Sequence, residues 1–403
     1  MASESTVEGS FLALLYDNNV DRADVPRIPN SIYRRTNEKG IEIRTQEDMN
    51  ELLMYLARPS GAGTEQPDQP YLMVICIRDT WTPRMEQIQS LLSYFPTIRS
   101  LGLAIRRWPW KYMQTSVSPM NRPLTLPQLP RLTTFVLTVE NKHNTQESVG
   151  QLLHDLYPAF AHQPISTMSV QNTRLAPGVP PRDPISYETG GWVTTPPKEH
   201  EHHGMTVLQH LKFRNVDLFA LESALLYPSG LETMEIDFRP AAITENAKEQ
   251  IGRRNMDVDD VFGRVCQSLI KLYFNHWYLG NHIAWARFSK LRVLRVHHRH
   301  LFGVNIPADE VVIPDLPCTL KQLIILECKV PMFRNHRELN ALEQNLTKFA
   351  ERLQRRDTER VPEQIIIHLH QGTGSVHESV VAALQKVQGL ELTFYEDTLP
   401  KDW

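Results

Sequence analysis

Histidine clusters come closest, among the residues of this chain, to the composition of a metal-binding or reactive site. HEHH occupies residues 200–203 and HHRH occupies residues 297–300. His368 and His370 alternate within an apolar stretch, which places both on one face of a strand. Zinc sites need imidazole, thiolate or carboxylate ligands at converging spacings, and neither H-E-x-x-H nor C-x-x-C is present. We therefore expect no metal and no other cofactor, and we interpret residues 200–203 as a solvated loop.

Two further motifs could bind a ligand. GTGS at residues 372–375 lies between a β-rich and a helical stretch, where backbone N–H groups can hold an anion, although a turn and a helix cap explain it equally. RRWPWKY at residues 106–112 contains Trp108 and Trp110, which could stack on bases or anchor a partner, or fold back as a loop over the repeat edge. G-x-G-x-x-G, G-x-x-x-x-G-K and G-x-S-x-G are absent, so the sequence predicts no enzyme.

Composition narrows the class of protein. The 403 residues are 41% hydrophobic and 22% charged, with a formal net charge of -3, so no basic footprint for nucleic acid is present. No apolar run is long enough to cross a membrane, and the first residues lack the basic start of a signal peptide. The four cysteines are far apart, which favours reduced core thiols. We expect a monomer in the cytoplasm or nucleus that binds neither membrane nor nucleic acid.

The framework that must position any site is a recurring L-x-x-L-x-L spacing. LQHLKF begins at Leu208, and LETMEI repeats its spacing from Leu231. With Ile, Val, Met and Phe allowed, each copy alternates apolar residues as a short strand does. The copies begin at Leu72 (with Ile75 and Ile77), Ile98, Leu132, Ile165, Leu208, Leu231, Leu291, Leu320 and Val387, and a partial copy covers Ile367 and Leu369.

Helical patterns occupy many of the gaps between these strands. They cover Thr45–Leu56 with a capping-box pair at Thr45 and Asp48, a segment after Thr82 and Pro83, a segment after Thr145, the aromatic-rich stretch 258–288, Leu339–Leu353, and a segment after a Ser375–Glu378 capping box. Strand–helix alternation with this period predicts an α/β, irregular leucine-rich-repeat-like solenoid, with about ten short parallel strands and helices on the convex side. An ordinary doubly wound α/β domain is the alternative.

Five segments resemble the degenerate leucine-rich repeats of fungal F-box-like proteins: FPTIRSLGLAI, LPRLTTFVLTV, YPSGLETMEIDF, FSKLRVLRVHH and LPCTLKQLIILEC. The resemblance extends from about Leu72 to Phe394 and implies a repeat fold. Members of that family often carry an N-terminal F-box that binds a Skp-type adaptor of a ubiquitin ligase. Residues 1–60 instead offer IPNSIYRR and a single capped helix, without the opening L-P-x-E phrase, so the F-box itself is not recognisable.

This organisation predicts two segments and one leading function. Residues 1–60 form an N-terminal cap or a partly ordered segment, and residues 61–403 form the solenoid with inserted loops at 106–130, 174–205 and 239–257. Because repeat solenoids present extended concave surfaces, we predict a non-enzymatic scaffold that offers this surface to a partner protein. The alternatives are the substrate-recognition subunit of a ubiquitin ligase with a degenerate F-box, and an α/β enzyme whose site combines residues distant in sequence.

The candidate partner-binding residues occupy the outward positions of the strands. When the copies at Leu208, Leu231 and Leu291 are placed side by side, each of two rows has an acid between two bases. Solvated ion pairs that only fix strand register are the alternative interpretation. The rows are Lys212–Glu235–Arg295 and Arg214–Asp237–His297, and the apolar Ile324 and Leu326 of the next copy flank them.

Overall fold

The computed structural model describes a set of separate ranges of the chain. These are residues 40–43, 45–57, 72–77, 85–105, 126–140, 162–173, 207–214, 225, 228–238, 262–263, 265–276, 283–302, 315–328, 336–355, 362–371 and 375–395. The chain divides into two compact units, Met1–Ser229 (unit 1) and Gly230–Trp403 (unit 2). Each unit is described by itself.

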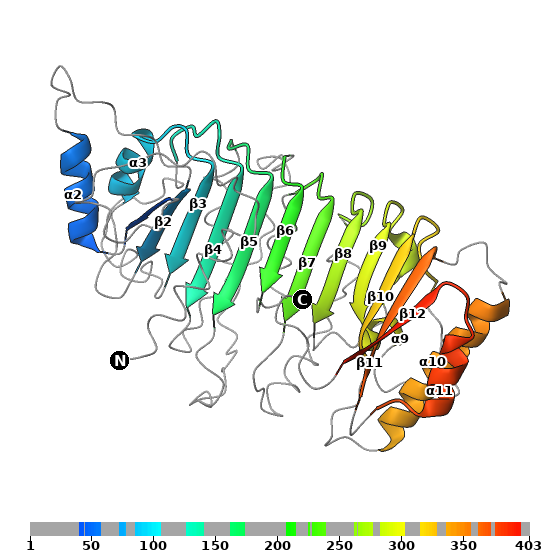
Figure 1. Ribbon diagram of the computed structural model, residues 1–403. Coiled ribbons are helices and arrows are strands. Elements are labelled where there is room, and N and C mark those ends of the chain that lie inside the picture. Colours follow the sequence, from blue (N-terminus) through cyan, green and yellow to red (C-terminus); the bar gives the residue numbers. More distant parts are fainter. Residues whose placement is uncertain are drawn as a thin grey trace, which may run out of the picture. The chain divides into compact units, whose positions relative to one another are not determined.

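Unit 1 is built on parallel strands that follow one another in chain order (Figure 1). Each strand pairs in parallel with the next one along the chain, from the first described strand to the sixth. The elements are β1 (Gly40–Ile43), α2 (Gln46–Leu56), β2 (Leu72–Ile77), α3 (Met85–Ser93), β3 (Ser100–Ile105), β4 (Thr134–Glu140), β5 (Thr167–Thr173) and β6 (His210–Arg214).

Unit 2 repeats this sequential parallel arrangement and has helices at its C-terminal end (Figure 1). Every strand again pairs in parallel with its neighbour in the chain. The elements are β7 (Thr233–Phe238), β8 (Lys271–His276), the short 3-10 helix η1 (Trp285–Arg287), β9 (Val293–His297), α9 (His298–Phe302), β10 (Gln322–Cys328), α10 (His336–Arg355), β11 (Gln364–His370), α11 (Glu378–Gln385) and β12 (Leu390–Tyr395).

Aligned apolar side chains form the core of each unit. Parallel pairing without a shift places equivalent repeat positions side by side, so one strand buries the apolar face of the next. Each side chain of the two rows below is at most 2% exposed, and burial of one such side chain contributes about 1.5–3 kcal/mol. The row of unit 1 contains Met73, Leu101, Phe135, Met168 and Leu211, and that of unit 2 contains Met234, Leu272, Leu294, Leu323 and Ile365.

An aromatic cluster packs against the core side of β8. The ring of Phe274 lies 5.6 Å from that of Phe262 and 6.5 Å from that of Trp285, with edge-to-face geometry in both pairs. Phe288 closes the cluster at 5.8 Å from both Phe262 and Trp285. These contacts hold β8 in place, and they explain why the stretch 258–288 is rich in aromatic residues without being one helix.

Capping residues define where two of the helices begin. Thr45 and Asp48 form the expected capping box at the start of α2: the Thr45 hydroxyl accepts from the Asp48 N–H at 3.1 Å, and Asp48 Oδ2 accepts from the Thr45 N–H at 3.0 Å. The helix after residue 375 is also present, but its N-cap is His377, whose ring nitrogen accepts from the Ser379 N–H. The prediction of a Ser375 cap is therefore wrong.

The structure confirms the predicted α/β solenoid of short parallel strands. All of the copies identified by L-x-x-L-x-L spacing contain a strand, and helices follow at the capped segments after Thr45 and Pro83 and at Leu339–Leu353. The register of β2 differs from the prediction by two residues, since Met73 and Ile75 take the inward positions assigned to Ile75 and Ile77. β1 and β8 were not predicted.

Several predictions concern segments outside the described ranges. They include the helix after Thr145, the HEHH cluster, most of GTGS, and the inserted loops apart from residues 126–130. β1 and α2 lie within the segment predicted as an N-terminal cap, and β1 pairs with β2. Cys266 is buried as expected, whereas Cys318 is exposed, so its assignment to the core is wrong. No helix within the described ranges is both long and apolar enough to span a bilayer.

Candidate protein-interaction surface

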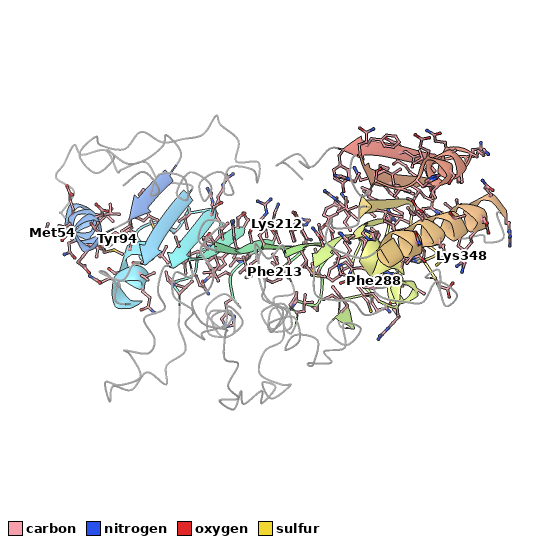
Figure 2. The ribbon with its side chains drawn as sticks, turned by 90° about the horizontal axis from the view of Figure 1, so that it is seen from below. Met54, Tyr94, Lys212, Phe213, Phe288 and Lys348 are labelled. Atoms are coloured by element: carbon pink, nitrogen blue, oxygen red, sulfur yellow. The ribbon has the colours of Figure 1, made fainter. Side chains whose placement is uncertain are left out.

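Strand residues that alternate with the inward apolar positions form what we call the alternate face of each unit. On β6, Lys212 and Phe213 project from opposite sides of the strand (Figure 2). Phe213 is buried in the core, whereas Lys212 is half-buried on the alternate face. Any surface that the strands offer to a partner must therefore be assembled from these alternate positions, because the inward positions are occupied by packing.

In unit 2 the alternate face has a row of partly exposed residues that crosses all of its described strands. We call it the middle row. Backbone register joins each member to the next across neighbouring strands. Its end residue on β12 is exposed and the others are half-buried. In strand order the middle row is Glu235, Tyr273, Arg295, Ile324, Ile366 and Glu391.

The centre of the middle row combines a stacked cation with aliphatic surface. The guanidinium carbon of Arg295 lies 5.9 Å from the centroid of the Tyr273 ring, within range of a cation–π interaction. On the other side of Arg295, Ile324 and Ile366 stand side by side. Strand spacing is about 4.8 Å, so the acids at the two ends of the row lie roughly 10–15 Å from Arg295. The row therefore presents a positive and apolar centre between two negative ends.

Hydrogen bonds between neighbouring strands fix the side chains around this row. Asn275 donates from Nδ2 to Asp237 Oδ1 at 3.0 Å. Gln322 donates from Nε2 to Gln364 Oε1 at 2.7 Å, and Gln364 donates in turn to the Glu391 carboxylate at 3.4 Å. Bonds of this kind restrict rotamers before any partner arrives, which lowers the entropy lost on binding.

The HHRH segment spans the end of β9 and the start of α9, where its histidines are packed. His297, His298 and His300 are 5%, 7% and 3% exposed. The ring of His297 lies 4.3 Å from that of His298 and 6.1 Å from that of His300, and His300 also contacts Phe274 at 4.8 Å. Within the part of the chain that the structure describes, no three His, Cys, Asp or Glu residues are arranged to hold a metal ion.

The histidines of β11 lie on the alternate face and are buried there. His370 packs its ring edge-to-face on Tyr395 at 5.5 Å. Burial lowers the pKa of His368, the positive charge of Arg295 lowers it further, and the Glu391 carboxylate partly opposes this shift. His368 is therefore disfavoured as a cation, and the positive charge of the middle row is concentrated on Arg295.

The two predicted rows of alternating charge are wrong, because an unpredicted strand separates their members. β8 lies between β7 and β9, and it places Tyr273 between Glu235 and Arg295. Asn275 likewise takes the position beside Asp237. Each acid consequently has a neutral side chain of β8 as its neighbour instead of a base of β9.

The remaining predicted site residues have mixed outcomes. Lys212 and Arg214 are half-buried on the alternate face of β6, in unit 1. Ile324 and Leu326 do flank the β9 residues, with Ile324 beside Arg295 and Leu326 beside His297. Leu326 is 4% exposed, however, so its assignment to the partner-binding surface is wrong. The expected solvent exposure of His297 is wrong, since neighbouring rings enclose it. The candidate loop anchors Trp108 and Trp110 lie outside the described residues.

The half-buried Tyr273 and the buried Asn275 are the alternate-face residues that the sequence reasoning missed, although a signal for them was present. Leu269, Leu272 and Phe274 have the L-x-x-L-x-L spacing, and all three are buried. The aromatic residues that surround this copy favoured a helical interpretation of the segment. The periodicity of these three residues alone would have identified the strand.

No protein-family model matches the chain, and none of the curated proteins is significantly similar to it. A function is therefore inferred from the side chains that the two alternate faces present.

Proposed function

We propose that this chain is a non-enzymatic interaction protein that binds a partner protein across the middle row of unit 2. The observation that carries the proposal is the centre of that row, where Arg295 is stacked on Tyr273 and adjoins Ile324 and Ile366. Tyrosine and arginine are enriched among the residues that dominate binding energy at protein interfaces. Aliphatic side chains beside them supply apolar surface that a partner can remove from water.

The charge pattern of the row defines what a complementary partner offers. The positive charge of Arg295 favours a carboxylate of the partner, and the end residues Glu235 and Glu391 favour basic side chains of the partner on either side of that carboxylate. Ile324 and Ile366 favour an aliphatic or aromatic side chain next to that carboxylate. A partner surface about 20–25 Å wide, acidic and apolar at its centre and basic at its edges, meets all of these requirements at the strand spacing of the sheet.

A partly buried arrangement of this kind concentrates binding energy at few positions. Alanine substitution at an interface hot spot costs about 2 kcal/mol or more, which corresponds to roughly a 30-fold loss of affinity. Arg295→Ala removes both the stacked cation and its hydrogen-bond donors. We expect Arg295→Ala to weaken the affinity for the partner roughly 30-fold without unfolding unit 2. The Arg295 side chain is half-buried on the alternate face and takes no part in the core.

The experiment compares quantitative affinity capture by wild-type chain, by Arg295→Ala and by the control Arg292→Ala. Arg292 is an exposed arginine that directly precedes β9, the strand of Arg295. The expected result is a protein captured equally by wild type and Arg292→Ala and strongly depleted with Arg295→Ala, with all three chains equally folded by circular dichroism. If every captured protein is retained by Arg295→Ala, the proposed surface is wrong.

The same experiment separates the alternative functions. Stoichiometric recovery of a Skp-type adaptor and a cullin, retained by Arg295→Ala, supports a ubiquitin-ligase subunit whose adaptor contacts lie elsewhere in the chain. An enzyme would bind substrate in a cleft with convergent titratable groups, so the discriminating observation for that alternative is a small molecule that protects the chain from thermal unfolding.

A further inference from the structure

Among the described residues of unit 1, three buried polar atoms on the alternate face have no hydrogen-bond partner within the protein. They are Thr138 Oγ1 on β4, and Ser169 Oγ and Gln171 Oε1 on β5. Thr138 is 5% exposed and Ser169 is 3% exposed, whereas Gln171 is half-buried. Folding shields each atom from bulk water, and no protein group takes over the lost hydrogen bond, which is unfavourable for polar groups in a protein interior.

The register of the strands brings these atoms together. Thr138 pairs directly with Gln171 across β4 and β5. Ser169 lies two residues before Gln171 on the same strand and the same face, at a separation of about 6.6 Å. On the neighbouring strand β6, Lys212 stands beside Ser169 and Arg214 beside Gln171. Two hydroxyls, one amide oxygen and two cationic side chains therefore occupy a single patch on three adjacent strands.

Packing does not account for the hydroxyl of Thr138. Val136 lies two residues earlier on the same strand and the same face, and it is 0% exposed. Valine has nearly the shape of threonine without its hydroxyl, so an apolar residue is compatible with this part of the face. The hydroxyl of Thr138 is thus a polar group that the fold alone does not require.

The charges and hydrogen-bonding groups of the patch select one ligand chemistry. The ionisable side chains described on the alternate face of β4, β5 and β6 are His210, Lys212 and Arg214, all of them basic; Glu140 ends β4 in the same alternation, and its side chain lies outside the described part of the chain. A carboxylate accepts hydrogen bonds from hydroxyls and pairs with lysine and arginine. The amide oxygen of Gln171 needs an N–H donor, which a peptide backbone supplies and a free anion does not.

We propose that this patch of unit 1 binds an extended acidic peptide segment of a partner protein. A Glu or Asp carboxylate of that segment accepts from Thr138 and Ser169 and faces the bases of β6, and a backbone N–H of the segment donates to Gln171. Gln171 is the half-buried member of the three. The site belongs to unit 1 and does not depend on the middle row of unit 2.

The test uses the full chain and a fluorescein-labelled peptide of alternating Glu and Ser, with a Gln–Ser peptide of the same length as the neutral control. Fluorescence anisotropy is measured at constant ionic strength for wild type, Thr138→Val and the matched control Thr134→Val. Thr134 lies on the same strand and the same face but is absent from the buried unpaired group. We expect the Glu–Ser peptide to bind wild type and Thr134→Val alike, and Thr138→Val about fivefold more weakly.

A second readout keeps the proposal testable apart from peptide affinity. Removal of an unpaired buried hydroxyl raises the melting temperature of the free chain, so Thr138→Val is expected to melt higher than wild type. A lower melting temperature means that the hydroxyl is already satisfied within the fold or by trapped water, and it overturns the proposal. Equal binding of the Glu–Ser and Gln–Ser peptides also overturns the proposal. So does a combined result in which inorganic phosphate displaces the Glu–Ser peptide and Gln171→Ala binds that peptide as well as wild type does, because the patch would then recognise an anion and not a peptide.

Discussion

Replacement of Leu294 by alanine tests the stacked core of unit 2 at a fully buried position. Leu294 is 0% exposed and lies in register between Leu272 of β8 and Leu323 of β10. The substitution removes three carbon groups, worth about 0.8 kcal/mol each in transfer free energy. The cavity left between two neighbours that are themselves held in strands adds to this loss, so we expect a decrease of about 3–4 kcal/mol in the free energy of unfolding.

Urea denaturation followed by circular dichroism measures this decrease, and thermal melting provides an independent estimate. For a cooperative unit of this size, 1 kcal/mol corresponds to about 2–4 °C, which predicts a drop of roughly 6–16 °C. The control is Arg292→Ala, a change at the exposed residue that directly precedes β9, with an expected effect within about 0.5 kcal/mol. A Leu294→Ala chain as stable as that control would refute the stacked-core assignment.

Three further predictions concern pH, capping and a turn. The pKa of His368 is lowered in the folded chain by burial and by Arg295, so the unfolded chain binds more protons near the ordinary value of 6.5. Stability from this group is present above pH 6.5 and declines as the pH falls from there toward the lowered folded-state pKa. Urea midpoints should show this decline in wild type and in His210→Asn, the control at an exposed position, and a smaller decline in His368→Asn. A decline in His368→Asn as large as that of wild type would contradict the assignment. Thr45→Ala breaks the capping box of α2 and should cost about 0.5–2 kcal/mol by urea denaturation, with no change contradicting the cap. Gly389 has φ of 83° and room for a Cβ, so Gly389→Ala should cost about 1–2 kcal/mol from backbone strain alone, and unchanged stability would contradict that conformation.

Local periodicity was sufficient to predict most strands, because an inward position must be apolar wherever the chain stacks on its neighbour. It failed where a second pattern overlapped the first. Around β8, aromatic residues such as Phe262 and Phe288 suggested one face of a helix. In the structure they lie in separate segments on either side of β8, where Phe262 packs against both Phe274 and Phe288. In β2 the continuous apolar run around Met73 offers two registers, and only pairing with β3 distinguishes them.

The candidate surface depended on a property that local patterns do not encode. Whether Glu235 or Arg295 points away from the core follows from the alternation within its own strand, and those assignments were correct. Which residue lies beside Glu235 depends on the next strand of the sheet. Because the copy that forms β8 was missed, Arg295 was predicted as the neighbour of Glu235, whereas the structure has Tyr273 there. The burial of His297 could not be predicted from its own strand either, since it arises from the rings of His298 and His300 on the following helix.

The most direct test of the proposed function is site-specific photocrosslinking from within the middle row. A benzoylphenylalanine at the position of Tyr273 retains an aromatic side chain there, and the same group at the 39% exposed Tyr94 of unit 1 provides the control. We predict that the protein lost from capture by Arg295→Ala forms a covalent adduct with the chain labelled at Tyr273 and not with the chain labelled at Tyr94. Adducts of equal yield at both positions, or none at Tyr273 with a partner that wild type captures, would contradict binding at this row.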